Sequence, residues 1–173
     1  MLKIANIDSV NIGMKSFIMI TKSIFSLLLI LFLGNINVAF SQKGMTFQQA
    51  KAAGLFNELD SLYHGGIDSD STKSVFKDQE AYIKAYQQFM LDAGNFLAKN
   101  NFKWGKQVRC FNKIYFSKEG KVDYFLYNFR EGQITPEQEQ EFARLIQLFI
   151  QQAKFGLEGE MPFSQCSPVV YND

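Results

Sequence analysis

The sequence predicts an α+β domain in which N-terminal helices pack on a small three-stranded antiparallel sheet with one further helix. Two segments rich in aromatic and β-branched residues, Val108–Phe116 and 121–129, flank a turn at 117–120 and indicate a β-hairpin. Apolar residues recur every three or four positions over 74–99, as on one face of a long helix. A strong helix start follows the hairpin at Thr135-Pro136.

Composition favours a single packed domain. The chain has 173 residues, of which 47% are hydrophobic, 20% charged and 15% aromatic, including 18 Phe. This content suits a core of large flat side chains, and disorder is not the default for such a chain. The net charge is +1. This charge does not support a nucleic-acid footprint, which would need a clustered basic face, so we expect no nucleic-acid partner.

The N-terminal segment has the pattern of a secretory signal peptide. Lys15 and Lys22 supply positive charge before the apolar run 24–33, and small residues precede a cleavage point at Gln42. The alternative is an uncleaved membrane anchor. Polar residues around Lys22 interrupt that segment, whereas a spanning helix usually needs about 20 apolar residues. The pattern therefore favours export with cleavage.

This interpretation divides the chain into two parts. Residues 1–41 form the signal peptide, with 1–13 as an upstream start extension. Residues 42–173 form one α+β domain, with a helical part at 42–105 and a hairpin–helix–strand part at 106–173. We expect this domain in the periplasm or outside the cell, without a stable membrane span after cleavage.

The helical part begins with a capping box. Thr46 can cap a helix, with Gln49 three positions later, and the apolar pattern continues to Tyr63. Gly54 weakens this helix by roughly 1 kcal/mol relative to alanine. A glycine-rich loop follows at 64–72.

The hairpin carries apolar residues on both of its faces. A sheet with one wet face would alternate more cleanly. We therefore expect cover on both sides: the helix that starts at Pro136 on one, and the N-terminal helices on the other. The former has a capping box of Thr135 and Gln138, and Gly156 is expected as its C-cap.

The last segment predicts a strand at the edge of the sheet. Residues 163–171 suit a strand, but Pro168 cannot donate a ladder hydrogen bond and so confines the strand to an edge or to a start after that residue. Val169, Val170 and Tyr171 are the candidate partner-binding residues of that edge.

The order of hairpin, helix and strand over 106–171 resembles the C-terminal domain of TonB-type energy transducers. The matching features are the strand Val108–Phe116, the Glu119-Gly120 turn, the strand 121–129, the helix from Pro136, Lys154-Phe155 at its end, and Val169-Val170 in the final strand. The resemblance implies a small antiparallel sheet whose last strand lies at an edge and pairs with partner strands in the periplasm. A long helical segment replaces that family's Pro-rich spacer, so energy transduction is not carried over.

Cys110 and Cys166 are the only cysteines. In an oxidising compartment they can form a disulfide. The TonB-like strand order instead places Cys110 nearer to Tyr171 than to Cys166, which favours free thiols. Both alternatives, the disulfide and the free thiols, stay open. Catalysis by Cys166 would need a nearby base, and the sole histidine, His64, falls in a loop.

The remaining motifs do not predict a catalytic or cofactor site. Asp68 and Asp70 could suggest calcium, but their loop lacks the later glycine and bidentate glutamate of a full site, which favours a solvated loop. We expect no cofactor and no metal. The sequence predicts an exported, non-catalytic binding module that contacts an envelope protein through its edge strand. The alternative is a small envelope enzyme or small-ligand binder with an aromatic pocket.

Overall fold

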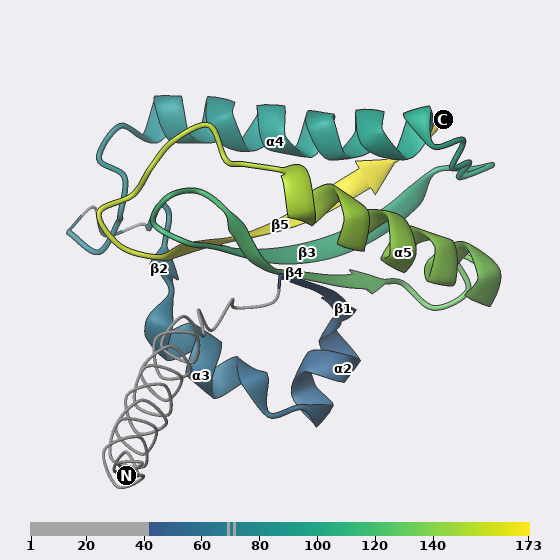
Figure 1. Cartoon of the computed structure of the whole chain (residues 1–173), viewed down its shortest axis with the longest axis horizontal. Helices are drawn as coiled ribbons and strands as arrows, with labels where there is room; N and C mark the ends of the chain where they lie inside the picture. The colour runs from purple at the N-terminus through teal and green to yellow at the C-terminus, as the bar shows by residue number, and fades with distance from the viewer. Residues whose placement is uncertain (1–41, 69, 71) are drawn as a thin grey trace, which may run out of the picture. The chain divides into compact units, whose positions relative to one another are not determined.

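The computed structural model describes residues 42–68, 70 and 72–173 of the chain. Contacts divide the chain after Ala39, and the described residues belong to the unit Phe40–Asp173. The elements of this α+β unit (Figure 1) are β1 (Lys43–Thr46), α2 (Phe47–Ala52), α3 (Leu55–Leu62), β2 (His64–Gly65), α4 (Gln79–Lys99), β3 (Val108–Phe116), β4 (Val122–Phe129), α5 (Pro136–Gln152) and β5 (Phe163–Tyr171). The predicted signal peptide lies outside the described residues.

The sheet is mixed and has five strands in the order β1-β4-β3-β5-β2. Its three central strands are antiparallel, as predicted, while β1 and β2 pair in parallel with β4 and β5. The prediction of a three-stranded, wholly antiparallel sheet was therefore wrong. The two added strands span four and two residues, which is too short for alternation to be visible in the sequence.

The hairpin turn follows the prediction. Gly120 has φ +79°, and its N–H donates to the Ser117 carbonyl at 2.9 Å. Ser117 N–H in turn donates to the Lys121 carbonyl at 2.8 Å. The Gly120 carbonyl also accepts a hydrogen bond from Phe155 N–H at 2.8 Å, which ties the turn to the segment after α5.

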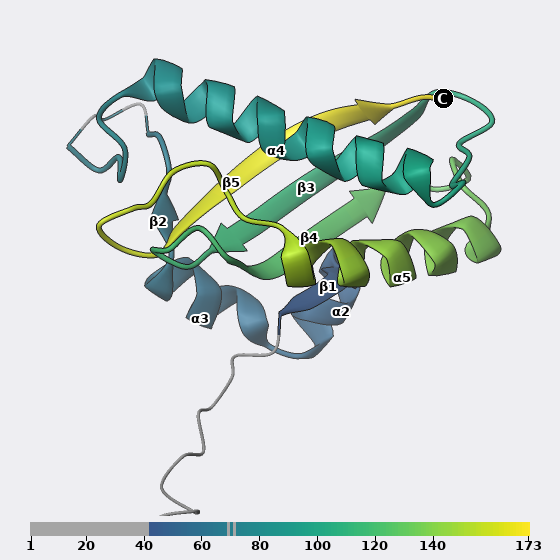
Figure 2. The ribbon, with the colours of Figure 1, turned by 45° about the horizontal axis from the view of Figure 1, so that its top comes forward.

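Helices cover both faces of the sheet (Figure 2). On one face, α4 and α5 enclose a large aromatic core that includes Ile114, Phe125 and Phe142. On the other, α2 and α3 cover a smaller cluster that includes Tyr115 and Leu126. The expectation of cover on both faces is confirmed for α2, α3 and α5.

Helix α4 lies on the other face from the one expected. It packs beside α5, and ring contacts such as that of Phe89 with Phe149 join the two helices. The periodicity of 74–99 showed that one side of the helix is buried, but periodicity does not encode which face of a sheet receives it.

Three helix ends refine the sequence prediction. The first helical segment breaks at Gly54, which has φ +69°, and so forms α2 and α3. Helix α4 begins at Gln79, with Asp78 as its N-cap. Helix α5 ends at Gln152 rather than near Gly156, because Lys154 joins Lys121 in a β-bridge.

Both predicted capping boxes are present. The Thr46 hydroxyl accepts from Gln49 N–H at 3.1 Å, while Gln49 Oε1 accepts from Thr46 N–H at 2.8 Å. Thr135 and Gln138 make the same reciprocal pair at 3.2 and 3.0 Å. These bonds satisfy backbone donors that a helix start leaves without partners.

Candidate functional site

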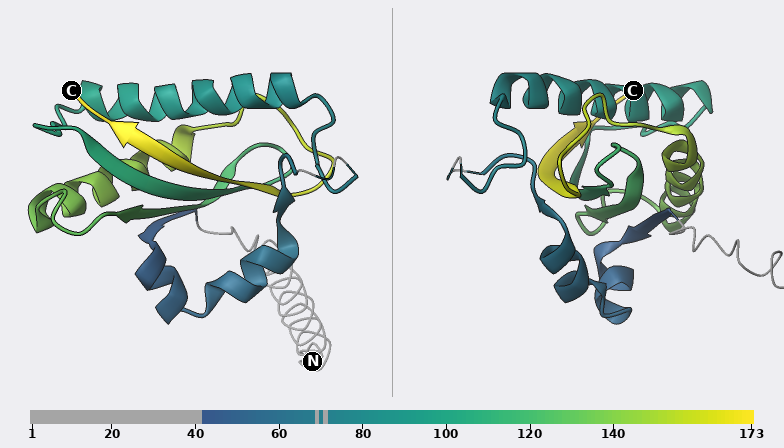
Figure 3. Two further views of the ribbon diagram at one scale, coloured as in Figure 1. Left: turned by 180° about the vertical axis from the view of Figure 1, so that it is seen from behind. Right: turned by 60° about the vertical axis from the view of Figure 1, so that its left-hand side comes forward.

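Strand β5 pairs along its whole length on one side and only at its start on the other. Its partners on β3 run from Phe116 opposite Phe163 to Val108 opposite Tyr171 without a register shift. On the other side, β2 pairs with Phe163 and Ser164 alone. Viewed from behind (Figure 3, left), β2 lies beside the start of β5. No other strand in the described part of the chain pairs with this edge.

The backbone of the open stretch points outward at every second residue. Gly66 N–H donates to the Ser164 carbonyl at 3.0 Å, so Ser164 faces β2. Because strand residues alternate in direction and the register is unbroken, Cys166, Pro168 and Val170 also face outward. Two of these outward residues can donate and all three can accept; Pro168 can only accept.

Apolar side chains flank this edge on the α2–α3 face of the sheet. Val170 is 53% exposed and Phe111, on the neighbouring strand, is 41% exposed. Pro168 lies opposite Phe111 in the register and is exposed as well. Of the three predicted edge residues, Val170 therefore faces solvent, while Val169 is half-buried and Tyr171 is buried against the core.

The end of β5 is held firmly in place. The Tyr171 ring stacks on Trp104 at 4.5 Å between centroids, and its hydroxyl accepts from Asn112 Nδ2 at 3.2 Å. The Asp173 carboxylate accepts from the N–H groups of Trp104 and Gly105 at 2.8 and 2.9 Å. These bonds lower the pKa of Asp173. The open edge is thus a preformed surface.

Helix α4 fixes the core side of the same strand. Tyr82 O–H donates to Gln165 Oε1 at 3.0 Å, and the Tyr86 hydroxyl shares a hydrogen bond with the Ser167 hydroxyl. Burial raises the pKa of Tyr86 to about 12, so this hydroxyl stays protonated at neutral pH. Ile83, on the same helix, is 44% exposed.

The two cysteines are both free. Cys110 lies opposite Val169 on the core face, and Cys166 lies opposite Lys113. These register positions point to opposite faces of the sheet, so the bridge weighed from the sequence is not formed. Cys110 Sγ donates to Asn112 Oδ1 at 3.1 Å, and burial raises the pKa of its thiol to about 12.

Asp60 of α3 and its C-cap residue Tyr63 link this helix to the sheet by hydrogen bonds. Asp60 Oδ1 accepts from Lys113 Nζ at 2.6 Å and from Tyr115 O–H at 3.0 Å. Tyr63 O–H donates to Asp123 Oδ2 at 2.8 Å. Burial raises the pKa of Asp123, while the hydrogen bond from Tyr63 opposes that rise.

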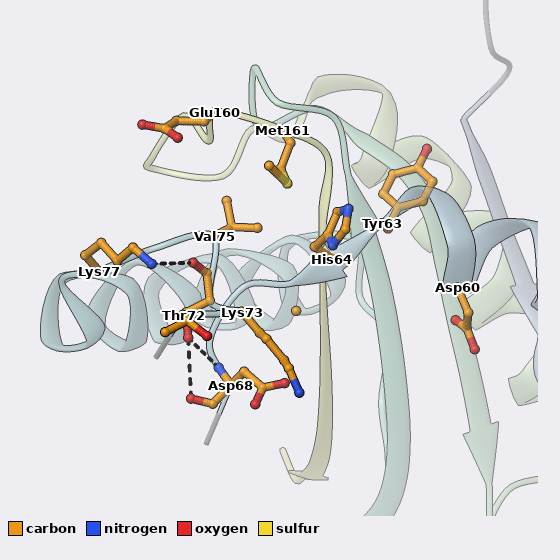
Figure 4. Close-up of a pocket in the computed structure, with 12 residues that line it drawn as sticks. Asp60, Tyr63, His64, Asp68, Thr72, Lys73, Val75, Lys77, Glu160 and Met161 are labelled. Atoms are coloured by element: carbon orange, nitrogen blue, oxygen red, sulfur yellow. Dashed lines mark hydrogen bonds between the residues drawn. The ribbon is translucent and has the colours of Figure 1, made fainter. Parts of the chain in front are cut away.

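A cavity of about 550 Å³ lies beside the glycine-rich loop (Figure 4). His64, Lys73 and Glu160 reach it from three segments. Asp68 and Asp70 serve the loop itself: Asp68 Oδ1 accepts from Asp70 N–H at 2.8 Å. Asp70 Oδ1 accepts from the Thr72 N–H and hydroxyl at 3.0 and 2.7 Å. Across the described residues, no group of three or more His, Cys, Asp or Glu side chains could hold a metal ion.

A second hollow, of about 520 Å³, lies between α4 and α5. Phe89, Phe96 and Phe149 contribute the aromatic part of its lining. Its polar lining includes two lysines, one carboxylate and two amides, from Lys99, Lys154, Asp92, Asn95 and Gln152. This groove corresponds best to the aromatic pocket weighed as the alternative from the sequence.

Comparison with known proteins gives no match among family models, curated proteins or solved structures. Within the described ranges, no helix is long and apolar enough to cross a membrane. The sequence pointed to the open edge through Pro168. It did not show that β2 covers the first two residues of β5, or that Phe111 is exposed beside it.

Proposed function

We propose that this protein is a non-catalytic binding module that takes up an extended segment of a partner protein along the open edge of β5. The observation that carries this proposal is the outward backbone from Cys166 to Val170, which no strand of the described chain pairs. An added strand can satisfy these donors and acceptors with main-chain hydrogen bonds.

The surroundings of the edge support recognition of one face of the added strand. Val170 and Pro168 offer exposed apolar surface beside every second side chain of that strand, and exposed Phe111, one strand further on, extends this surface. Because Tyr171 and Asp173 fix the end of β5, little conformational entropy would be lost from this side on binding.

We place the partner in the cell envelope, with this protein in the periplasm or secreted. The signal-peptide pattern before Gln42 supports that location. The order β3, β4, α5, β5 is the hairpin–helix–strand order on which the resemblance to TonB-type C-terminal domains rests, and that resemblance implies a last strand that pairs with partners in the periplasm. Transduction of energy is not part of the proposal.

The full-length gene is expressed, and the protein is purified as the cells process it. The test is how much partner protein it recovers from envelope extracts. Val170→Pro removes an outward donor, so partner recovery should fall sharply. Val170→Ala is the matched control, since it shortens the same side chain but keeps the N–H. Far-ultraviolet circular dichroism should show unchanged helices in both variants. Equal recovery with wild type and Val170→Pro would reject the edge as the binding surface.

A second candidate is small-ligand binding in the groove between α4 and α5. It is favoured by the aromatic lining from Phe89, Phe96 and Phe149 beside the cation of Lys99. A panel of amphipathic anions, screened by thermal shift on wild type and Lys99→Ala, tests it. Stabilisation that depends on Lys99 would support this function, and no stabilisation by any anion would reject it.

A further inference from the structure

We infer that Pro168 makes the open edge of β5 favour a segment of a different protein over a second copy of this chain. This inference rests on the proposed function, because it specifies the partner of the same edge. It follows from where the missing N–H of Pro168 points and from how β2 limits the space beside β5.

Pro168 leaves the internal ladder intact. It lies opposite Phe111 in the β3–β5 register, and its nitrogen faces away from β3, as do those of Cys166 and Val170. The β3–β5 pairing therefore loses no hydrogen bond to the proline. The donor is absent only on the side where a partner would bind.

Strand β2 limits the length of the β5 edge that a partner strand can pair with; this available stretch is called the open edge. It occupies the edge beside Phe163 and Ser164, where His64 N–H also donates to the Pro162 carbonyl at 3.2 Å. A partner strand is thus confined to the stretch from Gln165 to Tyr171. At about 3.3 Å per residue, the open edge is roughly 20 Å long.

A second copy of this chain pairs poorly with the open edge. Two copies related by a two-fold axis pair the same edge antiparallel. In the longest such register that avoids β2, Cys166 faces Val170 of the other copy, and the two Pro168 residues face each other. The central pair then has two carbonyls and no donor, so both of its hydrogen bonds are lost. Sliding the copies to separate the prolines shortens the ladder to the residues around Val170.

An extended segment of another protein meets only one Pro168. It can keep the hydrogen bonds at Cys166 and Val170, and one of its carbonyls turns to water opposite the proline. Its side chains on one face can meet Pro168 and Val170, which are exposed, and Phe111 extends this apolar surface one strand further on. A foreign strand thus loses one hydrogen bond opposite Pro168 where a second copy loses two, so hydrogen bonding at this edge favours the foreign strand.

Sedimentation of the full chain, purified in its processed form over a range of concentrations, tests this inference. Wild type should remain monomeric. Pro168→Val restores the donor with a β-branched residue, and it should strengthen self-association by roughly tenfold or more, since each dimer gains two ladder bonds. Pro162→Val is the matched control, because the N–H that it adds would face β2 and not the open edge. The double variant Pro168→Val/Val170→Pro should return to monomer.

Two results would overturn the inference: wild type that dimerises through β5, or folded Pro168→Val that stays monomeric. The proposed function is judged separately by partner recovery with Val170→Pro. If Pro168→Val dimerises while Val170→Pro leaves partner recovery unchanged, self-exclusion by Pro168 stands and the choice of this edge for the partner is rejected.

Discussion

Phe89 of α4 and Phe149 of α5 meet with ring centroids 5.4 Å apart and their planes inclined at 58°. Phe89 also contacts Phe116 of β3 edge-on at 5.2 Å. The two helices and the central strand thus share one aromatic junction, which holds α4 and α5 on the same face of the sheet. Phe89 is 3% exposed and Phe149 is 5% exposed.

Removing this junction should destabilise the whole domain. Phe89→Ala is expected to lower the free energy of unfolding by about 3–5 kcal/mol, through lost apolar burial and the cavity left behind. Chemical denaturation measures the loss. Leu91→Ala, on the same helix but 57% exposed, should cost under about 1 kcal/mol. Similar losses in the two variants would contradict the observed packing of α4.

Two glycines separate backbone strain from crowding. Gly105 has φ +68°, and no heavy atom lies within 4 Å of the position that a Cβ would take, so Gly105→Ala should cost about 1 kcal/mol for its left-handed backbone. A Cβ on Gly120 would lie 2.9 Å from the Phe155 carbonyl oxygen. Gly120→Ala should therefore cost about 2–4 kcal/mol in urea unfolding. Equal costs would show that the turn can move away from Phe155.

The two thiols should differ in their reactivity in the native state, and both should react after unfolding. Cys166 is exposed and should react with a maleimide in the folded protein, while Cys110 is buried with a pKa raised to about 12 and should not. Mass spectrometry after unfolding without reductant should find both labelled. Cys166→Ser should abolish native labelling. A thiol that stays blocked after unfolding would indicate a bond to a partner.

The Tyr63–Asp123 hydrogen bond should make stability depend on pH. Burial raises the pKa of Asp123 in the folded state, so its ionisation destabilises the fold as pH rises above the ordinary aspartate range. Tyr63→Phe removes the donor to this carboxylate and raises that pKa further. We expect a loss of about 1 kcal/mol at neutral pH, shrinking as the medium is made acidic and Asp123 is protonated.

Denaturant unfolding at several pH values checks this expectation. Tyr82→Phe is the matched control, because Tyr82 O–H donates to the neutral amide of Gln165 at 3.0 Å. Its cost should not change between neutral and acidic pH. If the cost of Tyr63→Phe is equally constant, Asp123 does not titrate against that hydroxyl.

Local chemistry in the sequence determined much of the fold. The capping boxes at Thr46 and Thr135 and the positive-φ turn at Gly120 depend on neighbours within a few residues, and all three are present. The candidate edge was visible for the same reason, because the lost donor of Pro168 is a property of that residue alone.

Tertiary structure decided what depends on contacts between distant segments. It placed α4 beside α5, added β1 and β2 to the sheet, and set Cys110 and Cys166 on opposite faces. The stripe of α4 specifies a buried side but not a partner, and β2 exists only because its two residues meet Phe163 and Ser164. Short-range patterns carry no record of such pairings, since their free energy comes from apolar burial and ladder bonds formed only when the chain is compact.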